Sequence, residues 1–251
     1  MEGRINMSYI VAIDGPAGSG KGTITKLVAK DLGLVSIDTG MLYRCHALAV
    51  LKNNIDVSDE EKVEEILEKI DINLKNKNNK QSVFLNGEDV TDQIRTPEVT
   101  GIVSKTSSIF GVREKITRLE RKIGYEWLKE GKNIIMEGRD ITTVVFPEAK
   151  VKIYLDATPI ERAKRRCRQN KRNGINQSFE EVLQSIMERD KNDMNKKVGA
   201  LKKAPDAIYV DSSKSSVNKI KHKIIKIIKQ KTKENRNEHY KIFKKIDSNF
   251  N

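Results

Sequence analysis

The sequence predicts a three-layer α/β domain in which helices cover both faces of a central parallel sheet. Apolar runs of strand length alternate with segments of helical period along most of the 251 residues, as in strands joined by crossover helices. A hydrophobic share of 37% is enough for a buried core. No apolar run approaches the ~18 residues of a spanning helix, and two cysteines are too few for a disulfide framework. We therefore expect a cytoplasmic protein.

The amino-terminal part begins with the most apolar strand. Residues 9–13 form an uninterrupted apolar run, which is typical of a strand buried on both faces. A helical segment at 21–32 follows it directly. A short apolar run at 34–37 predicts the second strand, and the helical period returns at about 40–51.

The pattern changes between about residues 70 and 99. Before this segment, Ser58 with Glu61 three residues later forms a capping box, which predicts the start of a third helix. Within it, short apolar pieces flank turns rich in Asn, Lys and Gly. We therefore predict a small antiparallel β insert in the α/β body.

Beyond the insert, the alternation of helices and strands resumes. A proline near the first turn favours a helix start, and Ser followed by Glu three residues later favours another. The predicted elements are a helix at 112–129, strands at 133–137 and 151–155, helices at 159–172 and 178–193, a strand at 207–210 and a final helix from 217.

The formal charge of +13 is concentrated at one end of the chain. Residues 213–251 hold twelve Lys or Arg and three acidic residues, which leaves only +4 for residues 1–212. Apolar residues of helical spacing, from Val217 to Ile228, favour a final helix that packs on the domain. The basic tail at 231–251 has no predicted role. Its composition is compatible with disorder and with contact to nucleic acid. Residues 1–6 also remain unexplained.

The first strand runs into a glycine-rich loop, a lysine and a helix, which is the context of a phosphate-binding loop. Glycines let backbone N–H groups converge on phosphate oxygens, and the lysine supplies a cation for the β and γ oxygens. Gly22 stands where most such loops have Ser or Thr, so we expect Mg²⁺ to be held mainly by ATP oxygens and water. The predicted ATP-binding residues of the loop are Gly15, Pro16, Ala17, Gly18, Ser19, Gly20, Lys21, Gly22 and Thr23.

Further motifs follow in a fixed order: DTGMLYR from residue 38, IRTPEV, VRE, GRD, TVVFP and ERD. With the loop, they make residues 8–212 similar to the bacterial cytidylate kinases, nucleoside monophosphate kinases of the P-loop class. The resemblance implies a kinase domain at 7–230, a monophosphate-binding insert at about 70–99 and a lid at about 158–174, and we expect a monomer. It also implies transfer of the γ-phosphoryl group of ATP, with Mg²⁺, to CMP or dCMP.

The resemblance also assigns individual residues. Lys21, Arg139 and Arg189 would be catalytic, and Arg162 and Arg166 would contact ATP from the lid. The residues implied for CMP binding are Thr39, Tyr43, Arg44, Ser104, Arg113, Arg139, Asp140, Arg189 and Asp193.

The implied pair Asp140 and Arg113 suits cytosine chemically. A carboxylate complements the N4 amino group, and a guanidinium complements N3 and O2. Uracil reverses two of these groups, so both contacts would become mismatched and CMP would be preferred. Lys196 and Thr142 depart from the family's usual Arg and Gly, and at Lys196 we expect a weaker or differently placed phosphate contact because lysine lacks the bidentate fork.

Three alternatives remain open at this stage. The acceptor could be UMP or another small phosphate, and the overall charge also fits an ATP-binding protein that binds nucleic acid. Asp38 could orient Lys21 or the water shell of Mg²⁺, or it could cap the helix that follows.

Overall fold

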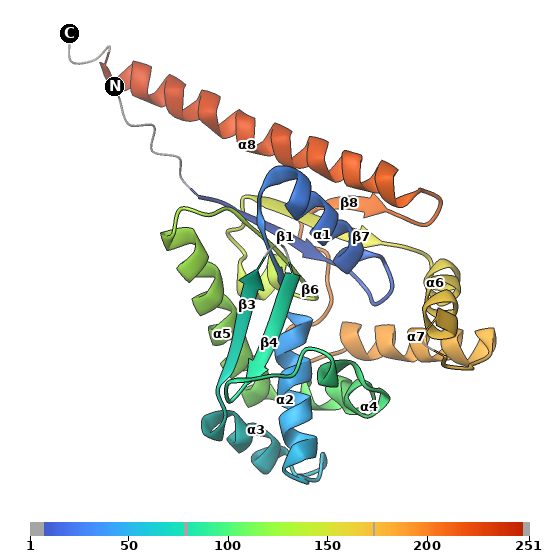
Figure 1. The fold of residues 1–251 in the computed structure, drawn as a ribbon. Coiled ribbons are helices and arrows are strands. Elements are labelled where there is room, and N and C mark those ends of the chain that lie inside the picture. Colours follow the sequence, from blue (N-terminus) through green and yellow to red (C-terminus); the bar gives the residue numbers. More distant parts are fainter. Residues whose placement is uncertain (1–7, 78–79, 173, 248–251) are drawn as a thin grey trace.

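Five parallel strands form the central sheet, in the order β2-β6-β1-β7-β8. A computed structural model describes residues 8–77, 80–172 and 174–247 (Figure 1). The sheet confirms the predicted α/β class. Its strands are β1 (Ile10–Asp14), β2 (Val35–Asp38), β6 (Ile134–Gly138), β7 (Val151–Asp156) and β8 (Ile208–Asp211).

Helices cover both faces of this sheet (Figure 1). Val11 and Ile13 of β1 pack with α1 (Lys21–Leu32) and α8 (Val217–Asp247), whereas Ile10 and Ala12 point to the opposite face. That face is covered by α2 (Gly40–Lys52) and α5 (Phe110–Lys129). Because side chains alternate along a strand, one apolar run supplies both cores, as its unbroken apolar character predicts.

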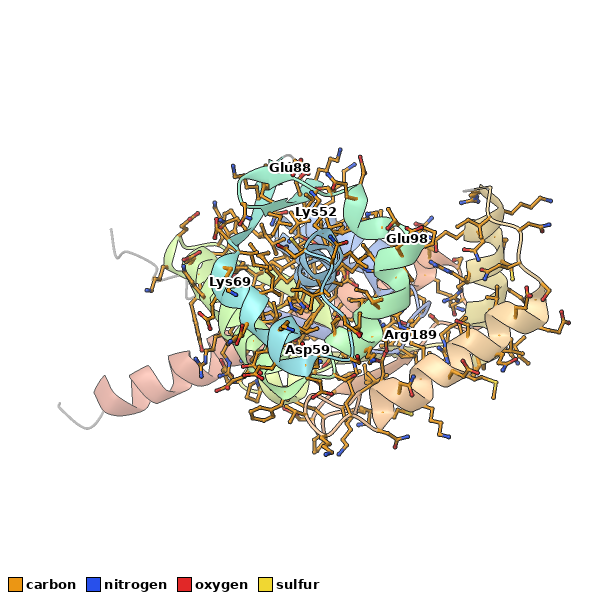
Figure 2. The ribbon with its side chains drawn as sticks, turned by 90° about the horizontal axis from the view of Figure 1, so that it is seen from below. Lys52, Asp59, Lys69, Glu88, Glu98 and Arg189 are labelled. Atoms are coloured by element: carbon orange, nitrogen blue, oxygen red, sulfur yellow. The ribbon has the colours of Figure 1, made fainter. Side chains whose placement is uncertain are left out.

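The β insert is a three-stranded antiparallel sheet, in the order β3-β4-β5. Val83 and Leu85 of this sheet belong to the same buried core as α2 and the central strands. At the surface, Lys52 of α2 pairs with Glu88 at 3.2 Å, and both are labelled in Figure 2. The predicted insert is confirmed, with strands β3 (Ile72–Lys77), β4 (Lys80–Leu85) and β5 (Glu88–Asp89).

The third helix, α3 (Glu60–Lys69), starts one residue later than the capping box predicted. Its N-cap is Asp59, whose carboxylate accepts a hydrogen bond from the Lys62 amide at 3.1 Å. Asp is as good an N-cap as Ser, and the oxygen of Asp59 satisfies the free amide of the first turn. The predicted cap at Ser58 is therefore wrong.

The segment after the insert holds a helix that the sequence patterns did not predict. Thr96 caps α4 (Pro97–Thr106) by accepting from the Val99 amide, and Pro97 occupies the first helical position. This helix separates the short 3₁₀ turn η1 (Gln93–Arg95) from α5. It places Val103 and Ser104 beside the pocket described below.

The carboxy-terminal helices begin close to where the caps predict. α6 (Pro159–Arg172) starts at the proline, and the complete capping box of Ser178 and Glu181 starts α7 (Phe179–Met194). α8 continues to Asp247, so the backbone of most of the predicted tail is helical; residues 1–7 and 248–251 lie outside the described part. None of the helices in the described ranges is long and apolar enough to span a bilayer.

Candidate active site

The glycine-rich loop joins β1 to α1, as predicted. Gly15 approaches the neighbouring strand so closely that a Cβ there would lie 2.0 Å from the Leu155 carbonyl oxygen. At the other end, Gly20 caps α1 with a left-handed φ of 96°, a conformation that glycine adopts without steric cost. Lys21 Nζ donates to the carbonyl oxygens of Gly15, at 2.5 Å, and Pro16, at 2.9 Å. The lysine is thus held inside the curve of the loop.

The charges of Glu137, Asp14 and Asp193 act on the buried Lys21 ammonium group. Burial, with the charge of Arg139, lowers the pKa of Lys21, and the carboxylate of Glu137 opposes that change. Burial, with the charge of Asp38, raises the pKa of Glu137. A Cβ on Gly22 would lie 3.3 Å from Glu137 Oε1, so glycine at this position leaves room for the carboxylate.

This carboxylate fits a magnesium ion that arrives with ATP. Glu137 Oε1 is buried without a hydrogen-bond partner among the described residues, and Mg²⁺ prefers oxygen ligands. Asp38, which precedes the N-cap residue Thr39, accepts from the Gly40 amide at 3.0 Å through Oδ1, so it contacts the first turn of α2. Over the ranges that the structure covers, no group of three or more Asp, Glu, His or Cys side chains could hold a metal.

One pocket brings the loop lysine together with most of the predicted acceptor residues. Thr39, Tyr43 and Ser104 line it, and the Thr39 hydroxyl donates to the Glu137 carbonyl oxygen at 3.0 Å. The remaining wall is formed by Lys21, Asp38, Gly40, Arg44, Val103, Ser107, Arg113, Glu137, Gly138, Arg139, Asp140, Arg189, Asp193 and Lys196. All nine residues predicted to bind CMP therefore line the same pocket.

Three arginines, Arg44, Arg139 and Arg189, line this pocket. Burial, with the charge of Arg139, lowers the pKa of Arg189 to about 10, and Arg189 Nε is buried without a partner in the described structure. Burial also lowers the pKa of Arg44, to which the charges of Arg166, Arg95 and Arg139 contribute. Figure 2 shows Arg189 on the part of α7 nearest the body. Buried like charges at this spacing favour an anion such as a phosphate.

Asp193 balances part of this charge. Its carboxylate accepts from Arg139 Nε at 2.9 Å and pairs with Lys196 Nζ at 3.1 Å. Lys196 also donates to the Ser107 hydroxyl at 3.2 Å. The ammonium group of Lys196 is therefore bound to Asp193 and Ser107 in the pocket wall. These bonds are consistent with the expected weaker or differently placed phosphate contact of Lys196.

At acidic pH, we expect the free energy of unfolding of Asp193→Asn to depend less on pH than that of the wild type. Burial alone would raise the Asp193 pKa, but the charges of Arg139, Lys196 and Arg189 outweigh it and lower the value to about 2. This contribution is present above the ordinary value of 3.8 and is lost as the pH falls to about 2. Between these limits the wild type should lose about 2 kcal/mol more than the variant, measured by urea unfolding. Glu188→Gln, an exposed carboxyl on the same helix, is the control; equal slopes for Asp193→Asn and wild type would contradict the prediction.

The other end of the pocket holds the pair predicted to face the base. Arg113 Nη2 donates to Asp140 Oδ2 at 2.5 Å, and Nη1 donates to the Ser107 carbonyl oxygen at 3.2 Å. The guanidinium lies 5.3 Å from the ring centre of Tyr43. Arg113 Nε is buried without a partner among the described residues, so one donor remains available.

Gly199 supports Arg113, a role that sequence analysis missed. It has a φ of +64°, and a Cβ there would lie 2.1 Å from Arg113 Nη2. Gly199→Ala would therefore displace the guanidinium and strain the backbone. We expect kcat/KM for CMP to fall by about 10- to 100-fold while the ATP KM changes less than about twofold, because a misplaced contact of 1–3 kcal/mol acts only on the acceptor. Gly131→Ala, at an unobstructed positive φ of +75°, is the matched control, and an unchanged kcat/KM in Gly199→Ala would contradict this role.

A buried aspartate fixes the turn after Asp140. Asp14, the last residue of β1, accepts from the amides of Ile141 at 2.9 Å and Thr142 at 2.7 Å. The Thr142 hydroxyl adds a third bond at 2.6 Å, which the glycine usual in the family could not make. The following π turn, η2 (Ile141–Val145), has i→i+5 bonds, a geometry often found at functional sites.

The predicted lid arginines lie outside the acceptor pocket. Arg162 is buried and bonded to Asp190, and Arg166 is exposed and donates to Gln169 at 3.1 Å. Arg165, which sequence analysis did not select, contacts the phosphate loop by donating to the Ser19 carbonyl oxygen at 3.1 Å. Helical spacing alone could have indicated Arg165, since it lies one turn after Arg162.

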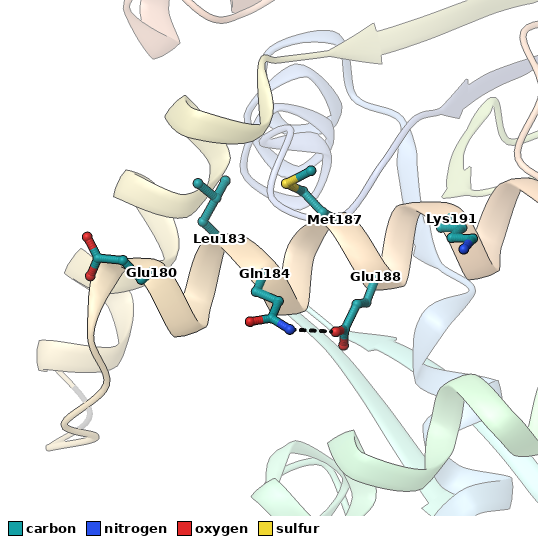
Figure 3. A pocket seen from close by; sticks show the side chains of 6 residues that line it. All are labelled: Glu180, Leu183, Gln184, Met187, Glu188 and Lys191. Atoms are coloured by element: carbon teal, nitrogen blue, oxygen red, sulfur yellow. Dashed lines mark hydrogen bonds between the residues drawn. The ribbon is translucent and has the colours of Figure 1, made fainter.

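A second hollow follows one side of α7 (Figure 3). Leu183 and Met187 supply its apolar surface, and the Gln184 side chain donates to Glu188 at 3.0 Å. None of its lining residues belongs to the loop or to the acceptor pocket. It is therefore separate from the candidate active site.

Comparison with known proteins agrees with the site. Residues 11–230 match the family described as cytidylate kinase. A cytidylate kinase of Caldicellulosiruptor bescii is 45% identical over 217 residues, which cover 86% of this chain and 94% of the relative. One of Bacillus subtilis is 40% identical over 223 residues, which cover 89% and 97% of the two chains. The chain therefore belongs to the cytidylate kinase family.

Proposed function

We propose that the protein transfers the γ-phosphoryl group of ATP to the 5′-phosphate of CMP, giving CDP and ADP. The observation that carries this proposal is one pocket that holds the loop lysine, the arginine cluster and the Asp140–Arg113 pair. The relatives that match over most of their length are named cytidylate kinase. The loop lysine suits the triphosphate, the arginine cluster suits the acceptor phosphate, and the Asp140–Arg113 pair suits the base.

The transfer needs no general base. The second pKa of a phosphate monoester is ~6, so the acceptor is largely dianionic at neutral pH and its oxygen attacks the γ-phosphorus directly. The bond from that oxygen to phosphorus forms as the bond to the β-phosphate oxygen breaks. The protein must bring two polyanions together and stabilise the charge spread over the transferring group. Lys21, Arg139 and Arg189 supply positive charge at that place.

The base end of the pocket distinguishes cytosine from uracil. Asp140 offers acceptor oxygens to the N4 amino group, and Arg113 Nε offers a donor to N3 or O2. Uracil would place O4 against a carboxylate and N3–H against a guanidinium. Buried mismatches of this kind are strongly disfavoured, which makes UMP the weaker acceptor.

The same proposal includes finer assignments. Mg²⁺ bound with ATP would neutralise phosphate charge, and Glu137 and Asp38 are the residues that would hold it through oxygen or water. dCMP should be a second acceptor because no side chain assigned here requires the 2′-hydroxyl. We also propose that the protein is a cytoplasmic monomer; its two cysteines, Cys45 and Cys167, are free, as is usual in a reducing compartment.

A coupled assay tests the proposed acceptor. ADP formation is measured with ATP, Mg²⁺ and, in separate reactions, CMP, dCMP, UMP or AMP. We expect CMP and dCMP to give the highest kcat/KM. Turnover with UMP alone would reject the base assignment, and absence of turnover with every nucleotide, together with salt-dependent RNA binding, would favour the nucleic-acid alternative.

A further inference from the structure

Three nitrogen atoms of the buried Arg162 side chain donate four hydrogen bonds to protein groups. Its Nη1 and Nη2 donate to the two carboxylate oxygens of Asp190 at 2.9 and 2.5 Å, which is the bidentate arrangement. Nε donates to the Ala157 carbonyl oxygen at 2.8 Å, and Nη1 also reaches the Ala17 carbonyl oxygen at 3.1 Å. Arg162 is 3% exposed, so this guanidinium is committed to an internal network.

The network joins two parts of the site that bind different substrates. Ala17 belongs to the phosphate loop, which would bind ATP. Asp190 directly follows Arg189 in α7 and lies one turn before Asp193, and both of these neighbours line the acceptor pocket. A single buried ion pair therefore connects the donor loop to the acceptor helix.

Packing makes this connection stiff. α6 lies directly on the loop, because a Cβ at Gly18 would be 3.2 Å from Arg162 Cβ. Ala163 of α6 packs with Val182 and Ile186 of α7 in a separate buried cluster. A shift of the loop would therefore be transmitted to α7 instead of being absorbed by a flexible joint.

Arg165 provides a contrast within the same helix. It contacts the loop through the Ser19 carbonyl oxygen, but its other partner is Ser212, whose carbonyl oxygen accepts from Nη2 at 2.6 Å. Ser212 follows β8, and its hydroxyl also donates to the Ser19 carbonyl oxygen at 2.9 Å. Arg165 thus links the loop to the segment that follows β8 and makes no such link to α7.

We propose that the Arg162–Asp190 pair is a positioning link that couples ATP binding to CMP binding. An occupied loop fixes the Ala17 carbonyl, and through Arg162 and Asp190 it fixes α7 with Arg189 and Asp193 in the arrangement that binds the acceptor. Arg162 then acts through Asp190 and is not a contact of ATP. This inference rests on the proposed function.

The experiment measures CMP affinity by calorimetry with and without β,γ-methylene-ATP, on the full chain. For the wild type we expect the analogue to tighten CMP binding at least fivefold, the lower end of usual coupling between sites, about 5- to 150-fold. In Asp190→Asn and in Arg162→Lys this factor should fall below about twofold. The double variant should be no worse than either single variant, because both changes break one link.

Two further variants separate coupling from stability. Glu161→Gln breaks the exposed Lys164–Glu161 pair of the same helix, 2.9 Å long, and should keep the wild-type factor. Arg162→Met with Asp190→Leu replaces both buried charges by apolar groups, an exchange that often preserves folding. A cooperative melt of this variant with the coupling absent supports the link even if the single variants unfold.

The outcomes are distinguishable. A wild type that binds no CMP in either condition would refute the proposed function itself. A wild type that binds CMP equally with and without the analogue, or variants that keep the wild-type factor, would overturn the link alone. Loss of analogue binding of 100-fold in Arg162→Lys with none in Asp190→Asn would instead make Arg162 a direct ATP contact and would also overturn it.

Discussion

Lys21→Met should lower kcat by about 10³-fold, because it removes the cation that the loop would offer to the phosphate oxygens of ATP. The side chain is buried and held by two loop carbonyl oxygens. Methionine has a similar length, and the buried charge it removes is costly to keep in the fold. We expect the melting temperature to change by less than about 4 °C.

Lys30→Met is the matched control, since Lys30 lies on the same helix and is exposed. Its kcat should stay within about twofold of wild type, as for most surface changes. The measurement is the coupled assay with CMP, beside a thermal melt. A Lys21→Met enzyme with more than a tenth of wild-type kcat would contradict the role of the loop.

Asp140→Asn should lower kcat/KM for CMP by about 10²- to 10³-fold and the CMP-to-UMP preference by at least about tenfold. The carboxylate gives N4 a charge-assisted acceptor, and asparagine offers a weaker one. The new amide can donate to uracil O4, so the clash between acceptors disappears. The two acceptors should therefore become more alike.

The same change leaves Arg113 buried without its carboxylate. Breaking a buried pair costs about 3–5 kcal/mol, so the melting temperature should fall by roughly 10 °C and kinetics should be measured well below it. Asp206→Asn breaks the Lys152–Asp206 pair, whose carboxylate is exposed, and should leave both kcat/KM values unchanged. An unchanged CMP-to-UMP ratio in Asp140→Asn would refute the base assignment.

Much of the fold follows from local patterns. The apolar run at 9–13 and the glycine-rich loop after it both concern residues that are adjacent in the chain, and both were confirmed as β1 and the loop. The antiparallel insert was also predictable, because short apolar runs joined by turns rich in Asn, Lys and Gly are a local pattern of hairpins. α4 was missed because its apolar positions are few and its start depends on one threonine cap.

The acceptor residues were predicted by the order of motifs, and the pocket brings them together. What the motifs could not give is which charged group each side chain contacts. Arg162 has the residue type expected of an ATP contact, yet its partner is Asp190, 28 residues away. Gly199 and Arg113 are even farther apart in the chain, and only the fold shows that one must be small for the other to fit.

The amino-acid sequence by itself determined the sheet, the phosphate loop and the family, because strand patterns, glycine turns and ordered motifs are properties of consecutive residues. The tertiary structure alone decided the pairing of Asp193 with Arg139 and Lys196, and the three bonds that Asp14 accepts beside the loop. These contacts depend on where the ends of separate strands and helices meet. Burial at that meeting point sets the energies of the charges, and no local pattern encodes it.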